Sequence, residues 1–387
     1  MSSGFASIEP RAFRKKQNLW LAYASELGAP LLRGTARILA GRPSTPPSEW
    51  RSGLILSHTH IGDVLYRTCS LPILRQSLPD CEWTYAVSPA SAEVLSDNPH
   101  IHEALAVVEG EDSWHLVRGG FSELKSRRFD VVLCSNTLRH YPDLALAAAL
   151  GIPNRIAFID KGLSGLVNHP VSFRFPDSYA SYFRTMVAAV TNRDPDWPLR
   201  PRVYPSAADE ARARELWWRS GLDDSKPVVA CSLRTRQADG NWPQDVMVSI
   251  LERARESRDF SVVLCGSASD APHLRALATT LPFPAPVIAG EAGLLAFAAF
   301  LERCAALLTL DSGPRHIGNA AGIPVVFARN LSHSKVEAGR YCDTETDLAP
   351  DVEYLTNEET DRITRALSVD SLAAVLLERI SVAGRPA

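Results

Sequence analysis

The stretch "LTLDSGPRHIGNAAGIPVVF" (residues 308–327) reads as a strand, a tight turn, a helix and a second strand. The apolar run stops at the turn "DSG" (311–313), and Pro314 suits the first helical turn because its missing N–H is not needed there. Such a helix start presents unpaired backbone N–H groups and the positive end of the helix dipole, which together favour a phosphate group. Two strands joined by a helix are typical of a parallel sheet.

The polar residues of this turn allow two interpretations. Asp311 or Ser312 could do no more than cap the helix. Alternatively, Ser312 and Gly313 bind a phosphate through a hydroxyl and the backbone, and His316, one turn into the helix, reaches an anion or a ribose. Arg315 would add a further donor at the same helix start. These extra donors favour a nucleotide-phosphate site.

The same alternation of short apolar runs and helical segments extends to both sides and predicts an α/β fold with parallel sheets covered by helices. Strands are expected at residues 53–57, 83–88, 104–109, 130–135, 155–159, 227–233, 260–266, 286–290, 306–310 and 323–328. Helices are expected at residues 63–77, 89–97, 120–127, 142–150, 178–191, 206–220, 243–257, 269–281, 293–304, 313–322 and 368–380.

Two domains are expected, because the chain has 387 residues and a single core rarely exceeds about 250–300 residues. The proline-rich stretch "GRPSTPPSEW" (41–50) closes an N-terminal extension, residues 1–50. Residues 51–205 would form an α/β domain with a connecting segment at its end. Residues 206–387 would form a second α/β domain, and its last helix, 368–380, could pack back on the N-terminal domain.

The N-terminal extension is basic and partly apolar. Residues 1–42 hold seven Lys and Arg against two Glu, interspersed with apolar residues such as Trp20 and Leu27. One interpretation is a basic amphipathic helix within residues 10–42 that lies peripherally on an anionic membrane surface. The other is a helix that docks on the body of the protein.

The overall composition is that of an ordinary globular protein, 45% hydrophobic and 22% charged, with a net charge of −3. This balance predicts no nucleic-acid partner. No apolar run reaches the roughly 18 residues of a transmembrane helix, and the N-terminus lacks the apolar core of a signal peptide. Seven scattered cysteines without CxxC spacing indicate reduced core residues in a cytoplasmic protein.

A second polar stretch, "CSLRTRQADGNWPQD" (231–245), follows the first strand of the C-terminal half. Arg234 and Arg236 would lie at the carboxyl end of that strand. A guanidinium group suits a diphosphate, and there it would stabilise the charge that develops on a leaving group. Surface loop arginines without a ligand remain the alternative.

A third polar stretch, "HTHIGDVLYRT" (58–68), follows the first strand of the N-terminal half. Gly62 permits a close approach of the backbone, and Asp63 lies at or near a helix N-cap. Asp63 would either cap that helix or act as a general base toward a hydroxyl group. His58 and His60 have no further metal ligands nearby, so no metal site is predicted, and we take them as polar loop residues or acceptor contacts.

Taken in order, three motifs of the chain resemble the bacterial heptosyltransferases, which transfer heptose from ADP-heptose to the lipopolysaccharide inner core. The first is "LILSHTHIGDVLYRTCSLPILRQSLPDCEWTYAV" (54–87), with its "GDVL" and "LPD". The second is "SDNPHIHEALAV" (96–107), and the third is "DSGPRHIGNAAGIPVVF" (311–327). Their order and spacing hold over roughly residues 52–330. Each motif is weak alone, but the ordered set is fairly specific.

The resemblance implies a GT-B fold, in which two Rossmann-like α/β/α domains face a central cleft. The N-terminal domain would take a hydroxyl acceptor, by default the lipopolysaccharide inner core, and the C-terminal domain would take a nucleotide-diphosphate sugar, by default ADP-heptose. It also implies an inverting, metal-independent transfer without a cofactor. The general base of the family falls on Asp63, with His60 and Gly62 in the acceptor-side loop. The donor-binding residues fall on Asp311, Ser312, Gly313 and His316, and on Arg234 or Arg236.

One departure from the family concerns the donor. The family usually has a lysine two residues before a "WP" pair, and Gly240 stands there in "DGNWP". Arg234 or Arg236 would replace that lysine, or the donor differs. Two alternatives to a transferase are considered: an isomerase like the nucleotide-sugar 2-epimerases, and a noncatalytic degenerate transferase that serves binding or assembly.

Overall fold

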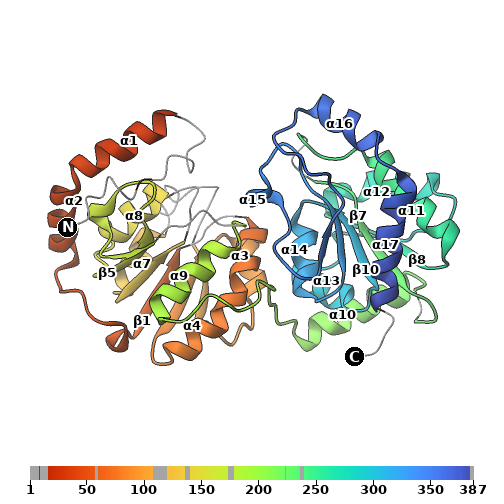
Figure 1. Ribbon diagram of the computed structural model, residues 1–387. Coiled ribbons are helices and arrows are strands. Elements are labelled where there is room, and N and C mark those ends of the chain that lie inside the picture. The colour runs from red at the N-terminus through yellow and green to blue at the C-terminus, as the bar shows by residue number, and fades with distance from the viewer. Residues whose placement is uncertain are drawn as a thin grey trace. The chain divides into compact units, whose positions relative to one another are not determined.

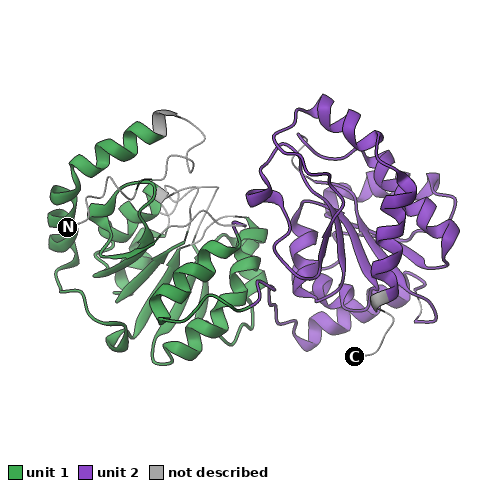
Figure 2. Cartoon of the chain, viewed as in Figure 1, with its two compact units in different colours: residues 1–176, 180–197 green, residues 177–179, 198–387 purple. Residues whose placement is uncertain are grey.

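The structure, a computed structural model, divides into two compact units (Figure 2). Unit 1 comprises residues 1–176 and 180–197, and unit 2 comprises residues 177–179 and 198–387. The residues that the structure describes are 8, 16–56, 60–107, 120–135, 140–172, 178–222, 224–235 and 239–383.

Unit 1 is built on a parallel sheet of six strands in the order β3-β2-β1-β4-β5-β6. Figure 1 labels β1 and β5 of this sheet. The strands are β1 (Ser52–Leu56), β2 (Glu82–Val87), β3 (Glu103–Ala106), β4 (Val131–Cys134), β5 (Asn154–Phe158) and β6 (His169–Val171). Gly53 of β1 lies opposite Trp83 of β2. A Cβ atom at Gly53 would lie 2.5 Å from the Trp83 ring, so the glycine makes room for the largest side chain of this sheet.

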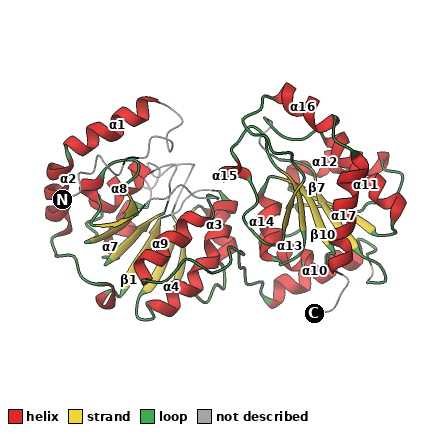
Figure 3. Cartoon of the chain, in the orientation of Figure 1, coloured by secondary structure: helices red, strands yellow, loops and turns green. Residues whose placement is uncertain are grey.

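Helices cover both faces of the unit 1 sheet (Figure 3). The helices after the extension are α3 (Ile61–Arg67), α4 (Leu71–Ser77), α5 (Pro89–Ala92), α7 (Phe121–Ser126), α8 (His140–Ala149) and α9 (Ser181–Thr191). The expected helix at 63–77 is divided by a 3-10 turn, Thr68–Ser70, which precedes Pro72. Proline has no N–H to continue the ladder of α3, so the second helix begins anew there.

The N-terminal extension forms two helices, α1 (Lys16–Leu27) and α2 (Ala29–Ala40), rather than one. They meet at Gly28, and α2 packs on α8 and on the 3-10 turn Ser164–Leu166 of unit 1. Docking on the body, one of the two interpretations of this segment, is therefore what the structure shows for the described residues.

Unit 2 repeats the plan of unit 1, with a parallel sheet in the order β12-β11-β10-β7-β8-β9. The strands are β7 (Val228–Ser232), β8 (Ser261–Gly266), β9 (Val287–Ala289), β10 (Ala306–Leu310), β11 (Val325–Ala328) and β12 (Glu345–Asp347). The helices are α10 (Ala207–Arg219), α11 (Gln244–Ser257), α12 (Ala271–Thr280), α13 (Leu294–Leu301), α14 (Gly313–Ala320), α15 (Lys335–Ala338), α16 (Asn357–Arg365) and α17 (Val369–Ala383).

The last helix, α17, packs on α11 and β10 within unit 2. Leu372, Ala373, Leu376 and Ile380 join the main apolar core of that unit. Its apolar face therefore packs on the core of unit 2; that residues 368–380 also pack back on the N-terminal domain stays a prediction.

Candidate functional site

The strand order reverses at one place in each sheet. In unit 1 the reversal lies between β1 and β4, and in unit 2 it lies between β10 and β7. Ligands of open parallel sheets bind at such switch points, beyond the carboxyl ends of the strands. Asp63 follows β1, Asp311 follows β10, and Arg234 follows β7. Because β10 and β7 pair directly, the structure places the last two residues at one edge of one sheet.

Asp63 is the third residue of α3, and the N-cap of that helix is His60. The Asp63 carboxylate does not cap the helix; it accepts a hydrogen bond of 2.6 Å from the hydroxyl of Tyr66, one turn further on. The capping interpretation of Asp63 is therefore wrong. His60 is exposed and extended, and Gly62 lies within the first helical turn, so both flank the carboxylate at the start of α3.

Two buried neighbours, Tyr66 and Arg67, hold Asp63 in position. Burial raises the pKa of Tyr66 well above its usual value, so its hydroxyl keeps a proton to donate to Asp63. Arg67 donates to the backbone carbonyl of Asp63 (2.9 Å) and to that of Ser135 (3.3 Å), which directly follows β4. The first turn of α3 is thereby tied to the second strand of the switch point. Sequence reasoning missed both residues, although their i+3 and i+4 spacing from Asp63 was a usable signal.

The turn after β10 leaves its helix start uncapped by side chains. Ser312 is the N-cap of α14 but makes no side-chain cap, and its hydroxyl donates to the carbonyl of Leu310 (3.3 Å). A Cβ atom placed on Gly313 would have no atom within 4 Å. The glycine is therefore not required by packing, and open space lies beside the first turn of α14.

Arg315 does not serve this turn as a ligand donor, contrary to our expectation. Its side chain is 1% exposed and makes a two-point ion pair with Glu345 (2.6 and 3.0 Å). It also donates to Asp311 (2.7 Å) and to the carbonyls of Ala338 and Gly339. The arginine thus anchors Asp311 and the segment between α15 and β12, and none of its donors is directed outward.

His316 extends this buried network toward the surface. Its Nδ1 lies 2.7 Å from the hydroxyl of Tyr341, and the two rings stack with centroids 5.5 Å apart. Asn319 donates to the same hydroxyl (2.9 Å), and burial raises the pKa of Tyr341, so that its proton is retained. His316 Nδ1, the Tyr341 hydroxyl and the Asn319 amide thus form one hydrogen-bonded cluster at the first turns of α14.

Arg234 lies beyond β7 and is partly held by an acid. Its Nε donates to Asp270 (3.0 Å), while 41% of the side chain is exposed. Burial would raise the pKa of Asp270, but hydrogen bonds from Ser267 and the Arg234 charge outweigh this and lower it. The ion pair orients the guanidinium at the sheet edge. Arg236 and His58 lie outside the described residues.

Gly240, where the family has lysine, is locked into the structure. Its φ is +72°, and a Cβ atom would lie 2.3 Å from Oδ1 of Asn330 and 2.6 Å from the backbone N of Ser332. Its N–H donates to Asn357 (2.7 Å), and its carbonyl accepts from the N–H of Leu331 (2.9 Å). The backbone is left-handed and docked against the segment after β11, so a lysine cannot replace this glycine without rebuilding the loop.

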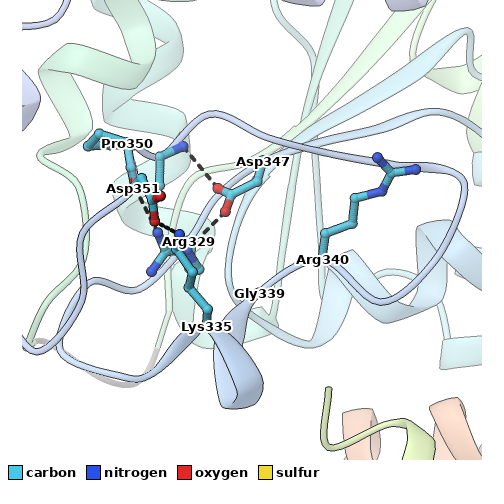
Figure 4. A pocket seen from close by; sticks show the side chains of 8 residues that line it. Arg329, Lys335, Gly339, Arg340, Asp347, Pro350 and Asp351 are labelled. Carbon is cyan, nitrogen blue, oxygen red and sulfur yellow. Dashed lines mark hydrogen bonds and ion pairs between the residues drawn. The ribbon is translucent and has the colours of Figure 1, made fainter. Parts of the chain in front are cut away.

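A hollow of about 430 Å³ lies in unit 2, beyond β11 and β12 (Figure 4). Two of its cationic groups are already paired: Arg329 with Asp347 (2.9 Å), and Lys335 with Asp351. It is displaced from the switch point between β10 and β7. Its charges are largely satisfied by its own walls, so we do not assign the donor to it.

Within the described ranges, no group of three or more His, Cys, Asp or Glu side chains is arranged to hold a metal ion. The helices that the structure describes include none with the length and apolar character needed to cross a bilayer. All seven cysteines are buried and free.

Comparison with known proteins identifies a family. The model of "Glycosyltransferase family 9 (heptosyltransferase)" matches residues 121–328, more than half of the chain. This stretch includes the turn after β10 but begins after Asp63. Among curated proteins, the lipopolysaccharide core heptosyltransferase OpsX of Haemophilus influenzae is 21% identical over 286 residues, 71% of this chain and 78% of that protein.

Solved structures of low sequence identity share the fold. A family 9 glycosyltransferase from Veillonella parvula matches with a TM-score of 0.73 at 16% identity, over 88% of this chain and 99% of that one. ADP-heptose lipopolysaccharide heptosyltransferase II of E. coli matches with a TM-score of 0.62 at 17% identity, over 86% and 98%. The two parallel-sheet units thus have the GT-B fold. The chain belongs to glycosyltransferase family 9, the heptosyltransferases, and is a glycosyltransferase.

Proposed function

We propose that this glycosyltransferase moves a heptose from ADP-heptose to a hydroxyl group of a glycan acceptor, by default the lipopolysaccharide inner core. The transfer inverts the anomeric configuration and needs neither a metal ion nor a cofactor. In this proposal the N-terminal domain, residues 51–205, takes the acceptor, and the C-terminal domain, residues 206–387, takes the donor. The noncatalytic alternative is favoured only by Gly240, which stands where the family usually has a lysine, and the epimerase alternative would show as epimerised donor without acceptor.

The observation that carries the proposal is the position of the polar residues at the two switch points. Asp63 at the reversal in unit 1, and Asp311 with Arg234 at the reversal in unit 2, occupy the places where parallel sheets bind ligands. The choice of donor and acceptor is supported by relatives: the OpsX protein acts on the lipopolysaccharide core, and the structure of E. coli heptosyltransferase WaaC holds ADP-2-deoxy-2-fluoro heptose.

The chemistry assigned to unit 1 is proton removal. The Asp63 carboxylate accepts the proton of the acceptor hydroxyl as that oxygen attacks the anomeric carbon. Tyr66 occupies Oδ1 of the carboxylate, so Oδ2 is the atom that we assign to the acceptor. His60 and Gly62 complete the acceptor-side loop.

The chemistry assigned to unit 2 is stabilisation of the departing diphosphate. The backbone at Gly313 and the Ser312 hydroxyl bind it at the positive end of α14, and His316, one turn further on, contacts the donor. Asp311, held by Arg315, positions the turn. Arg234, with Arg236, supplies the positive charge that the lysine gives in relatives, since Gly240 cannot carry one.

The proposed function is tested by incubating the chain with ADP-heptose and a heptose-deficient core oligosaccharide. We expect ADP release, an acceptor heavier by one heptose and an inverted anomeric configuration in the NMR spectrum, all unchanged by EDTA. Epimerised donor in the absence of acceptor would point to the isomerase instead. Retained configuration or loss of activity in EDTA would contradict the mechanism, and failure to bind any nucleotide sugar would contradict the function.

The open space at Gly313 leads to a separate prediction. Gly313→Ala should fold as stably as the wild type, because the added Cβ atom meets nothing within 4 Å. The methyl group should nevertheless obstruct the approach of the diphosphate to the backbone and weaken donor binding about tenfold, roughly 1.4 kcal/mol. Calorimetric titration with ADP measures this change.

The matched control is Gly34→Ala in α2, where a Cβ atom also has open space. This variant should leave the ADP affinity unchanged. Equal ADP affinities for the two variants would remove the donor role of Gly313.

We also propose that the chain works in the cytoplasm and associates peripherally with the inner membrane through residues 10–42. The lipid-linked nature of a lipopolysaccharide acceptor supports a location at that membrane.

A further inference from the structure

The helices α1 and α2 dock on unit 1 mostly through small side chains. Ala22, Ala29 and Ala36 are buried, and two glycines of the body allow the close approach. A Cβ atom on Gly165 would lie 2.3 Å from the carbonyl oxygen of Ala29, and one on Gly162 would lie 2.6 Å from Oγ of Ser25. Of the larger apolar residues in α2, Leu32 packs partly on the core. The docking itself thus needs few of the large apolar side chains that these helices carry.

Most of those large side chains are turned to solvent. Eight large apolar residues are exposed in the described part of the chain, and six of them lie in α1 and α2. They are Trp20, Leu21, Leu27, Leu31, Ile38 and Leu39. Ile38 is 81% exposed and Trp20 is 73% exposed. So dense a group within 20 residues is unusual for a water-facing surface and marks an interaction site.

The exposed charges of the same two helices are all positive in the described part of the chain. Arg33 and Arg37 are exposed, and neither pairs with a carboxylate among the residues that the structure describes. Glu26, the only acidic residue of the two helices, is buried and accepts hydrogen bonds from the backbone N–H and hydroxyl of Ser164. Both arginines line a groove of about 970 Å³ between α2 and the body, which Arg42 and Asn168 also line. The exposed surface is therefore apolar and positive, without a balancing acid.

We propose that α1 and α2 form a membrane-docking surface whose occupant is a bilayer of anionic lipids. The exposed apolar side chains enter the interfacial region, where a tryptophan is favoured, and Arg33 and Arg37 bind lipid phosphates at the mouth of the groove. This names the surface and the lipid chemistry behind the peripheral location proposed above, and rests on it.

The length and the charge of α1 and α2 favour an anionic bilayer as the partner of this surface. Each helix has 12 residues, which spans about 18 Å, whereas a bilayer core is about 30 Å thick. The pair therefore lies on the surface and does not cross it. A second copy of the chain would bring the same unpaired arginines to the contact, and like charges would oppose that pairing. An anionic bilayer complements both the apolar and the positive parts.

The test is co-sedimentation of the full chain with vesicles. We expect binding to vesicles that contain phosphatidylglycerol, little binding to pure phosphatidylcholine, and a loss of binding as salt rises. Two double variants test the surface: Leu31→Ser/Ile38→Ser and Arg33→Glu/Arg37→Glu. The vesicle affinity of each should be at least roughly tenfold lower than that of the wild type. All four side chains are exposed, so the variants should fold; circular dichroism checks this.

The matched control is Trp218→Ala, which removes a large side chain, 75% exposed, from unit 2; its vesicle binding should equal that of the wild type. Inorganic phosphate should displace no more of the chain from vesicles than sodium chloride of equal ionic strength. Clearly stronger displacement by phosphate would reveal a site for the free ion and overturn the lipid assignment. Unchanged binding in the double variants, or a concentration-dependent dimer that they abolish, would also overturn it.

The outcome is separable from that of the proposed function. Both double variants should keep the wild-type rate of heptose transfer to a soluble, delipidated core acceptor. A chain that transfers heptose but ignores anionic vesicles would contradict the docking surface alone. A chain that binds the vesicles but transfers nothing would contradict the proposed reaction alone.

Discussion

Asp63→Asn is expected to lower the turnover of heptose transfer by about 10²–10⁴-fold, the usual contribution of a single general base. Asparagine has the size of aspartate and keeps an oxygen that can accept the hydrogen bond from Tyr66, so the start of α3 should stay in place. What disappears is the ability to take the proton from the acceptor hydroxyl. Steady-state kinetics with saturating donor and acceptor measure the loss.

Donor affinity separates this role from a structural one. Because Asp63 lies in unit 1 and the proposed donor residues lie in unit 2, the dissociation constant of ADP should stay within a few-fold of the wild-type value. Asp80→Asn, which removes an acid with a side chain 74% exposed from the same unit, should keep the full rate. A folded Asp63→Asn protein with normal turnover would exclude the carboxylate as the base.

The sequence predicted the strands well because most of them are buried on both faces. Runs such as Val228–Ser232 and Ala306–Leu310 are wholly buried, and strands of this kind read as continuous apolar stretches. All ten expected strands are present. The two that were not expected, His169–Val171 and Glu345–Asp347, are edge strands of three residues with polar or proline residues. Nothing in their composition separates them from loops.

The missed helix α16 could have been found. Thr356 and Glu359 form a capping box at its start, with Thr356 accepting from the Glu359 N–H and the Glu359 carboxylate accepting from the Thr356 N–H. That pair, three residues apart, is a recognised signal of a helix start.

The donor turn illustrates what the local pattern could not reveal. The residues "DSGPRH" predicted a helix start rich in donors, and Ser312 is indeed its N-cap. The pattern did not show that Arg315 turns inward, because its partner Glu345 lies 30 residues later in an unpredicted strand. The same limit applies to Tyr341, whose contact with His316 depends on that strand. Local spacing identifies which residues are polar, but only the tertiary partners decide which of them are left for a ligand.

Glu345→Gln is expected to have the largest effect on stability. It removes the charge that compensates Arg315, which stays 1% exposed with only Asp311 as an ionic partner. Breaking a buried ion pair from one side costs about 3–5 kcal/mol. Because Asp311 still pairs with Arg315, we expect a loss of about 3 kcal/mol. Urea unfolding measures the change. Glu210→Gln, which removes an exposed acid beside Arg214, should cost roughly 0.5 kcal/mol or less.

The pH dependence of stability gives an independent check on the same pair. Burial alone would raise the pKa of Glu345, but the Arg315 charge and the hydrogen bonds from Arg315 and Asn319 outweigh it and hold the pKa below its ordinary value of 4.5. The stabilisation by this carboxylate is therefore complete above about pH 4.5 and is lost as the pH falls through the lowered pKa of the folded state. The stability gap between wild type and Glu345→Gln should narrow in acid accordingly. A gap that stays constant from neutral pH to pH values well below 4.5 would mean that packing, and not the charge of Glu345, holds Arg315 in place.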